Sequence, residues 1–245
     1  LMLPDRDYYL NPEFAAQRAA LRQYAATVLS LVGWPDAEHA ADSVVAFQTR
    51  VAEVSWSRTQ QRDVVATYNP MPVDSLAALA PGFEWQAFFQ GLELGDVRRV
   101  VVRELSAFPR LARVFASTPV TTLQAYLAVT ALYHTGPYLA RPFADPWFAL
   151  HDRALTGQQV ETVRWKRGIR AVGGGDYLGG DRFDRFGNLG WAVGQLYTDR
   201  YFPPASKRAI EQLVANVKVA MRARLEQLDW MSAATKAEAL RKLDT

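Results

Sequence analysis

The chain contains no cysteine among its 245 residues, so it has no disulfide framework and no thiolate that could act as a nucleophile or a zinc ligand. Its only histidines are His39, His134 and His151. No two of them have the i, i+4 spacing that places two imidazoles on one face of a helix around a metal ion. We therefore expect each histidine to have a structural or surface role, and no metal site built from residues close in sequence.

Long apolar runs are also missing. The longest candidate, residues 126–133, is interrupted by Thr130 and is much shorter than a membrane span, so no transmembrane segment is expected in this chain.

Charge of one sign is not in excess, because 28 Lys and Arg stand against 25 Asp and Glu, giving a net charge of +3. That balance argues against a nucleic-acid partner, and Glu161 before the basic segment 164–170 favours a salt-bridged helix there.

Hydrophobic residues make up 49% of the chain and charged residues 22%, which is typical of a folded globular protein. Apolar residues recur mostly at helical spacing, and Asn, Asp, Ser, Pro and Gly mark helix ends. The predicted fold class is mainly α, an irregular multi-helix domain with at most one or two short strands, the best candidate being residues 97–105. The expected helices cover residues 12–32, 35–54, 75–79, 85–92, 107–117, 120–135, 145–155, 158–172, 189–201 and 205–228, with a last helix capped by Ser232.

Three of these helices carry apolar sets that predict a buried face. The set in the helix over 35–54 is Val44, Phe47, Val51 and Val54; the set over 120–135 is Leu123, Leu127 and Leu132; and the set over 205–228 is Ile210, Leu213, Val217 and Met221. Trp165, Trp191 and Trp230 lie at helix-spaced positions and are expected to anchor the core. We interpret residues 1–245 as a single helical domain or a fragment of one.

The segment 173–188 is rich in glycine and predicts a long flexible loop. It lacks the glycine spacing and the following Lys-Ser or Lys-Thr of a phosphate-binding loop. A calcium loop is excluded as well, because Asp176, Asp181 and Asp184 do not alternate at the required positions. We therefore expect this loop to bind neither a phosphate group nor calcium.

Several short signatures occur in a characteristic order along nearly the whole chain. They are Leu3 to Leu10; Arg62 and Asp63; Tyr68, Asn69, Pro70 and Met71; Phe83, Glu84 and Trp85; Arg164, Trp165, Lys166 and Arg167; Gly194 to Tyr197; Tyr201, Phe202 and Pro203; and Trp230, Met231 and Ser232 with Thr235, Lys236, Lys242 and Leu243. Together they resemble the neprilysin and endothelin-converting-enzyme family of zinc metallopeptidases, in the region upstream of the catalytic motif. Each signature alone is weak, and their order carries the resemblance. We assign them a structural role.

The resemblance implies a helical domain that closes like a lid over a thermolysin-like zinc domain and selects short peptides. The family binds zinc through His-Glu-x-x-His and a downstream Glu, and none of these motifs occurs in this chain. The zinc ion and the catalytic domain are therefore expected beyond residue 245, with no catalytic or metal-binding residue in this segment. The expected partners are that C-terminal catalytic domain and peptide substrates, whose contact residues are not identified. Apolar surface should be exposed where the catalytic domain docks.

Two departures from the family pattern have consequences. The link between residue 167 and residue 194 is longer than usual, and the absence of cysteine contrasts with the disulfide-rich animal members. Bacterial relatives tolerate variation in this link, and the absence of cysteine points to a bacterial-type enzyme, for which family analogy favours a periplasmic or other extracytoplasmic location. The alternative to a peptidase lid is a stand-alone helical module that binds peptides or a protein partner without catalysis.

Overall fold

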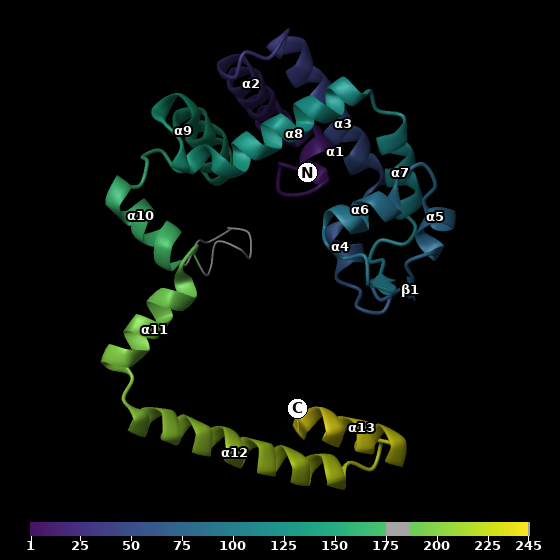
Figure 1. Ribbon diagram of the computed structural model, residues 1–245, viewed down its shortest axis with the longest axis vertical. Helices are drawn as coiled ribbons and strands as arrows, with labels where there is room; N and C mark the ends of the chain where they lie inside the picture. Colours follow the sequence, from purple (N-terminus) through teal and green to yellow (C-terminus); the bar gives the residue numbers. More distant parts are fainter. Residues whose placement is uncertain (175–186, 245) are drawn as a thin grey trace. The chain divides into compact units, whose positions relative to one another are not determined.

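The computed structural model describes residues 1–174 and 187–244 (Figure 1). The chain divides into two compact units, Leu1–Glu161 and Thr162–Thr245, which we describe separately as unit 1 and unit 2. Helices account for nearly all regular structure in the described residues, with one two-stranded sheet, and this confirms the mainly α prediction. Most of the predicted Gly-rich loop, with Asp176, Asp181 and Asp184, lies outside the described residues.

Unit 1 begins with helices whose ends are set by local caps. The side chain of Asn11 accepts a hydrogen bond from the backbone N–H of Glu13, as expected for an N-cap. Gly33 has a φ of +72° and ends the first long helix, where a left-handed residue is required. Asp36 caps the next helix by accepting from the His39 N–H. These elements are α1 (Asp7–Leu10), η1 (Pro12–Phe14), α2 (Ala15–Leu31) and α3 (Ala37–Val54).

A compact connector follows α3. It consists of α4 (Arg58–Gln61), β1 (Pro70–Pro72), α5 (Ser75–Leu79), α6 (Trp85–Gly91) and β2 (Arg99–Val101). The predicted strand at 97–105 is present as β2 but has only three residues. It pairs antiparallel with β1, in register Met71↔Val100. The prediction that the segment around β1 contains only turns and short helices was therefore wrong, because the strand arises from pairing with a distant segment.

The rest of unit 1 is helical. It contains α7 (Phe108–Ala116), α8 (Val120–Thr135), η2 (Gly136–Tyr138), α9 (Arg141–Phe148) and η3, a π-helix (Ala149–Ala154). The helix predicted over 145–155 begins earlier, at Arg141, because Pro142 suits a first turn. Gly157 then takes a φ of +78° and ends the helical run, as predicted.

The core of unit 1 lies between α2, α3 and α8, with Leu150 added from η3. Leu21, Val28 and Leu29 of α2 are completely buried. Val44 and Phe47 of α3 are also buried, as their spacing predicted. The apolar face of α8 differs from the prediction, because Ala125 and Val129 face the core while Leu127 is 63% exposed.

A buried polar group ties the N-terminal segment to α3. The Tyr9 hydroxyl accepts hydrogen bonds from the backbone N–H groups of Met2 (3.2 Å) and Leu3 (3.1 Å) and donates to Gln48 Oε1 at 2.7 Å. The Met2 N–H also donates to Gln48 Oε1, at 2.8 Å. Burial raises the pKa of Tyr9 far above its usual value, because the phenolate would lose its hydration. Tyr9 therefore stays neutral and keeps its donor proton.

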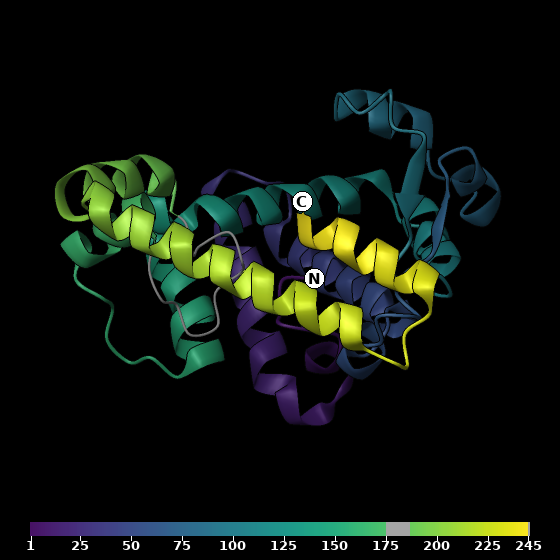
Figure 2. The ribbon, with the colours of Figure 1, turned by 90° about the horizontal axis from the view of Figure 1, so that it is seen from below.

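Unit 2 contains α10 (Arg164–Gly173), α11 (Gly190–Tyr201), α12 (Pro204–Gln227) and α13 (Ala233–Asp244). The predicted helix over 158–172 begins six residues late, after the N-cap Val163. Ser232 Oγ accepts from the Thr235 N–H at 3.2 Å and caps α13, as predicted. Figures 1 and 2 show α12 and α13 side by side, and Lys236 Nζ donates to the Glu226 carbonyl at 3.0 Å across this pair.

Candidate functional site

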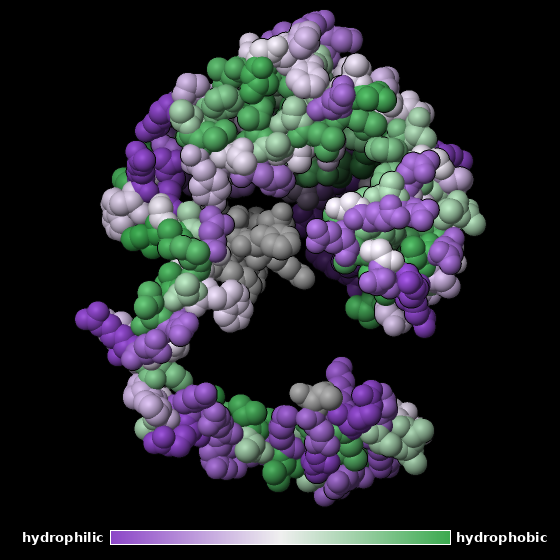
Figure 3. Space-filling model, in the orientation of Figure 1, coloured by the Kyte–Doolittle hydropathy of each residue, from purple (hydrophilic) through white to green (hydrophobic). Residues whose placement is uncertain are grey.

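The most prominent surface feature of unit 2 is an apolar face on α12. Ile210, Leu213, Val217 and Met221, the set predicted to share one side of the helix, are all between 48% and 58% exposed. On α11, Leu196 is 71% exposed and Tyr197 is 60% exposed. Figure 3 shows hydrophobic side chains on the visible surfaces of both helices. In the described part of unit 2, only Leu225 is buried. We call the exposed apolar residues of α11 and α12 the unit 2 apolar face.

The three tryptophans predicted to be core anchors are exposed instead. Trp165 is 64% exposed, Trp191 is 83% exposed and Trp230 is 74% exposed. The prediction was wrong because helical spacing identifies an apolar side but does not say what covers it. Within unit 2, the helices pair locally and leave most apolar side chains in contact with solvent.

Replacing Trp230 by alanine is therefore expected to lower the free energy of unfolding of this chain by less than about 1 kcal/mol, since little of its ring is removed from water. Leu225→Ala is the matched control, because Leu225 is only 8% exposed and should cost more. Urea unfolding followed by circular dichroism measures both variants. A loss of 3 kcal/mol or more for Trp230→Ala would contradict the exposed placement.

Two of the family-signature pairs in unit 1 shape one turn. Asp63 Oδ1 accepts hydrogen bonds from the N–H groups of Val65 and Ala66, both at 2.9 Å. The Asn69 side chain donates to the carbonyls of Ala66 (2.7 Å) and Val102 (3.0 Å), joining the turn to the end of β2. Arg62 and Tyr68 flank these residues and are exposed. Asp63 and Asn69 thus hold the backbone of this turn, while Tyr68 points an apolar ring into solvent.

The signature residues of unit 2 lie on different elements. Trp165, Lys166 and Arg167 lie in the first turn of α10, where Lys166 Nζ is 5.5 Å from the centre of the Trp165 ring, a cation–π distance. Trp230 and Met231 lie in the turn between α12 and α13, with Met231 half-buried. The signature residues are therefore spread over several elements and do not form one chemical centre within either unit.

The histidines do not assemble a metal site. The His151 ring stacks on Trp147 at a centroid distance of 4.3 Å, and its Nδ1 is 2.8 Å from Oδ1 of the buried Asp152. The His134 ring lies edge-on to Tyr133. Over residues 1–174 and 187–244, no group of three His, Asp or Glu side chains has the arrangement of a metal site. The zinc ion implied by the resemblance therefore does not fit the described residues.

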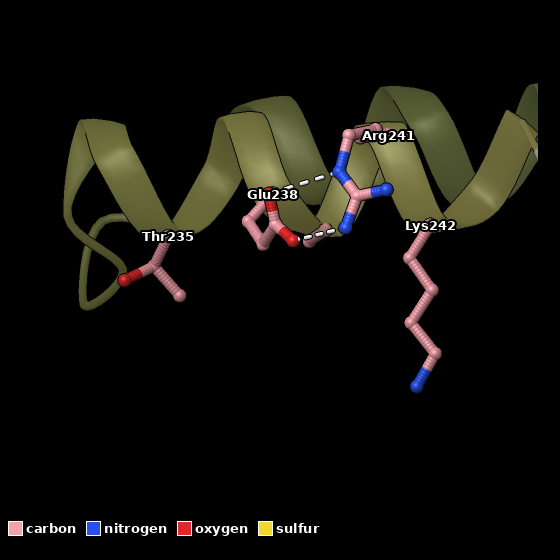
Figure 4. Close-up of a pocket in the computed structure, with 5 residues that line it drawn as sticks. Thr235, Glu238, Arg241 and Lys242 are labelled. Atoms are coloured by element: carbon pink, nitrogen blue, oxygen red, sulfur yellow. Dashed lines mark hydrogen bonds and ion pairs between the residues drawn. The ribbon is translucent and has the colours of Figure 1, made fainter. Parts of the chain in front are cut away.

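A shallow hollow of about 310 Å³ lies on α13 and is lined by Thr235, Glu238, Ala239, Arg241 and Lys242. Figure 4 shows that Glu238 and Arg241 are paired, while Lys242 points away from them. Hydrogen bonding to Arg241 lowers the pKa of Glu238, and the same contact raises the pKa of Arg241. Both groups are thus fixed in their charged forms, which suits an exposed ion pair and not a general acid or base.

Comparison with solved structures shows the class of protein to which this fold belongs. Over 99% of this chain and 36% of the other, the structure superposes on the zinc metalloprotease ZMP1 of Mycobacterium tuberculosis in its open state, with a TM-score of 0.78 and 31% identity. A family model described as "Peptidase family M13", for the N-terminal part of these peptidases, matches residues 1–245. The chain belongs to peptidase family M13, which confirms the resemblance to the neprilysin family.

Curated relatives agree with this family. Endothelin-converting enzyme-like 1 of Mus musculus is 29% identical over 250 residues, covering 99% of this chain and 30% of the relative. Membrane metallo-endopeptidase-like 1 of Homo sapiens is 26% identical over 260 residues, covering 99% of this chain and 32% of the relative. This chain therefore spans about a third of the length of these relatives. They are animal proteins, so the comparisons do not single out a bacterial type.

No helix in the described ranges is both long enough and apolar enough to cross a membrane.

Proposed function

We propose that this chain is the helical lid part of a zinc metalloendopeptidase that hydrolyses short peptides, and that it is inactive alone. The observation that carries this proposal is the unit 2 apolar face, in a chain whose family is that of metallopeptidases. A peptidase lid must present apolar surface to the domain that it covers. A helix in water gains nothing from an exposed apolar stripe, and such stripes mark interaction sites.

The partner proposed for this face is the C-terminal catalytic domain of the same protein. The side chains of Leu213 and Val217 on α12, and of Leu196 on α11, are more than half exposed in this chain. Each square ångström of apolar surface removed from water contributes about 25 cal/mol, so several such side chains supply several kcal/mol of docking energy. Unit 1 has its own core and would provide the rigid part of the lid.

The zinc chemistry is proposed to come entirely from the catalytic domain. When bound there, zinc would activate a water molecule for attack on the peptide bond. In support of this, no group of His, Asp or Glu side chains in the described residues has the arrangement of a metal site. Its own part in the reaction is to enclose the substrate and to exclude long chains, which restricts cleavage to short peptides.

The purified 245-residue chain is expected to hold much less than one equivalent of zinc and to cleave no peptide. Elemental analysis and a mixed-peptide digest followed by mass spectrometry test both expectations. Zinc close to one equivalent after removal of excess metal, or cleavage that a chelator abolishes, would overturn the proposal that this chain is inactive alone.

The sequence of the reading frame after the Thr245 codon separates the two candidate functions. His-Glu-x-x-His followed by a Glu ligand would support the lid. A stop codon soon after Thr245 would exclude it and favour the stand-alone module. Such a module should bind peptides without hydrolysis, which calorimetry with the purified chain would detect.

A further inference from the structure

A pocket on unit 1 brings three arginines together. It is a shallow and largely open depression between α3 and α7 with a volume of about 280 Å³, lined by Arg50, Val54, Arg110, Arg113, Val114 and Ser117. None of these residues belongs to the family signatures or to the unit 2 apolar face. Its lining combines positive charge with an apolar wall formed by Val54 and Val114.

Arg50 is held in place by neutral partners. Its guanidinium donates to the Ser117 hydroxyl at 2.5 Å and to the Thr118 hydroxyl at 3.5 Å. Both hydroxyls in turn donate to the Val114 carbonyl in the last turn of α7, at 3.2 Å from Ser117 and 2.6 Å from Thr118. The guanidinium is therefore fixed, but its positive charge is not neutralised by these contacts.

The two arginines of α7 have no carboxylate partner either. Arg110 Nε donates to the Ser106 carbonyl at 3.2 Å, which is again a neutral acceptor. Arg113 follows three residues later, on the same side of the helix. In the part of the chain that the structure describes, no carboxylate lies within ion-pair distance of Arg50, Arg110 or Arg113.

Some other arginines of unit 1 do form ion pairs. Arg22 lies 2.6 Å from Asp42, Arg58 lies 2.7 Å from Asp5, and Arg141 lies 3.0 Å from Asp145. Not every other arginine of unit 1 is paired with a carboxylate, since Arg18 donates to the carbonyls of Tyr8 and Asn11. The pocket differs in that three arginines without an ion pair line one place, where they form a local excess of positive charge. The negative end of the α7 dipole offsets only about half a charge of the three.

We propose that this pocket binds a compact oxyanion, and that a phosphate group is its best ligand. Guanidinium groups present planar N–H forks that match phosphate and carboxylate oxygens. A doubly charged phosphate neutralises more of a three-arginine cluster than one carboxylate does. This site is independent of the proposed peptidase function.

Calorimetric titration of the full 245-residue chain with inorganic phosphate, at constant ionic strength set with chloride, tests the proposal. Saturable binding with one site is expected. Arg113→Gln and Arg110→Gln should each weaken the affinity about tenfold or more, because each removes charge-assisted hydrogen bonds. Arg208→Gln is the matched control, since it removes one exposed positive charge from α12 and should leave the affinity unchanged.

A second titration with acetate shows whether the site prefers a phosphate or a carboxylate. Weaker acetate binding that depends on the same arginines supports a phosphate-preferring site. The absence of saturable phosphate binding would overturn the proposal, as would an equal loss in Arg208→Gln, because binding would then be a general effect of charge. Circular dichroism verifies that each variant is folded, and Arg113→Lys, which keeps the charge but loses the fork, should bind phosphate more weakly than the native chain.

Discussion

Replacing Leu29 by alanine is expected to lower the free energy of unfolding of unit 1 by about 2 to 5 kcal/mol. Leu29 is completely buried in the core between α2, α3 and α8, where no water can fill the space left by the removed atoms. The loss therefore combines the transfer free energy of the side chain with the cost of a cavity. Such a change is a large fraction of the total stability of a domain of this size.

Native-state hydrogen exchange of the α2 amides in increasing urea measures this loss for unit 1 separately, because two units need not unfold in one step. Leu31→Ala is the control on the same helix, since Leu31 is 43% exposed and should cost about 1 kcal/mol or less. Equal losses for the two variants would contradict the placement of the core.

Removing the hydroxyl of Tyr9 with Tyr9→Phe is expected to cost about 2 to 3 kcal/mol. The ring stays, so the packing is conserved, but the buried Leu3 N–H loses its hydrogen-bond acceptor. Gln48 Oε1 loses a donor at the same time and keeps only the Met2 N–H. An unsatisfied buried polar group costs more than an average hydrogen bond contributes.

Tyr8→Phe is the matched control for this variant. The neighbouring Tyr8 ring stacks on Phe14 at a centroid distance of 4.2 Å and should keep this contact without its hydroxyl. Thermal unfolding of both variants, followed by circular dichroism, compares them directly. A Tyr9→Phe variant as stable as Tyr8→Phe would show that the Tyr9 hydroxyl contributes nothing to the fold.

Helix ends set by a local cap were predictable, because a cap depends only on residues close in sequence. The starts of α9 and α10, which have no side-chain cap, were not. Asn11, Gly33, Asp36 and Ser232 set helix ends through caps that need only the next few residues, and each was found where the sequence placed it. The short helix α5 was predicted with its observed bounds for the same reason. Local signals of this kind require no knowledge of the rest of the fold.

Features that depend on distant residues were not predictable from one sequence. Strand β1 has two prolines and no strand pattern, and it exists only because β2 pairs with it. Tyr9 and Gln48 are 39 residues apart, so no spacing rule connects them. The predicted burial of Trp191 and Trp230 was wrong for the same reason, because an apolar helix face does not show which other part of the chain packs against it.

The two candidate sites also differ in whether residues close in sequence form them. The apolar face of α12 was visible in the sequence as a set at helical spacing, although its exposure was not. The three-arginine pocket was missed, because Arg50 on α3 meets Arg110 and Arg113 only through the packing of α7. A basic cluster drawn from two helices far apart in sequence leaves no motif that a linear reading could detect.

The unit 2 apolar face has a consequence for synthesis on the ribosome. The core of unit 1 is complete once Leu150 has emerged, so unit 1 is able to fold while α11 and α12 are still being made. When those helices emerge, most of their apolar side chains stay exposed in the described part of unit 2, with Leu225 as the buried exception. They form the stretch of the nascent chain that general chaperones would be expected to hold, and the stretch from which aggregation during overexpression would begin.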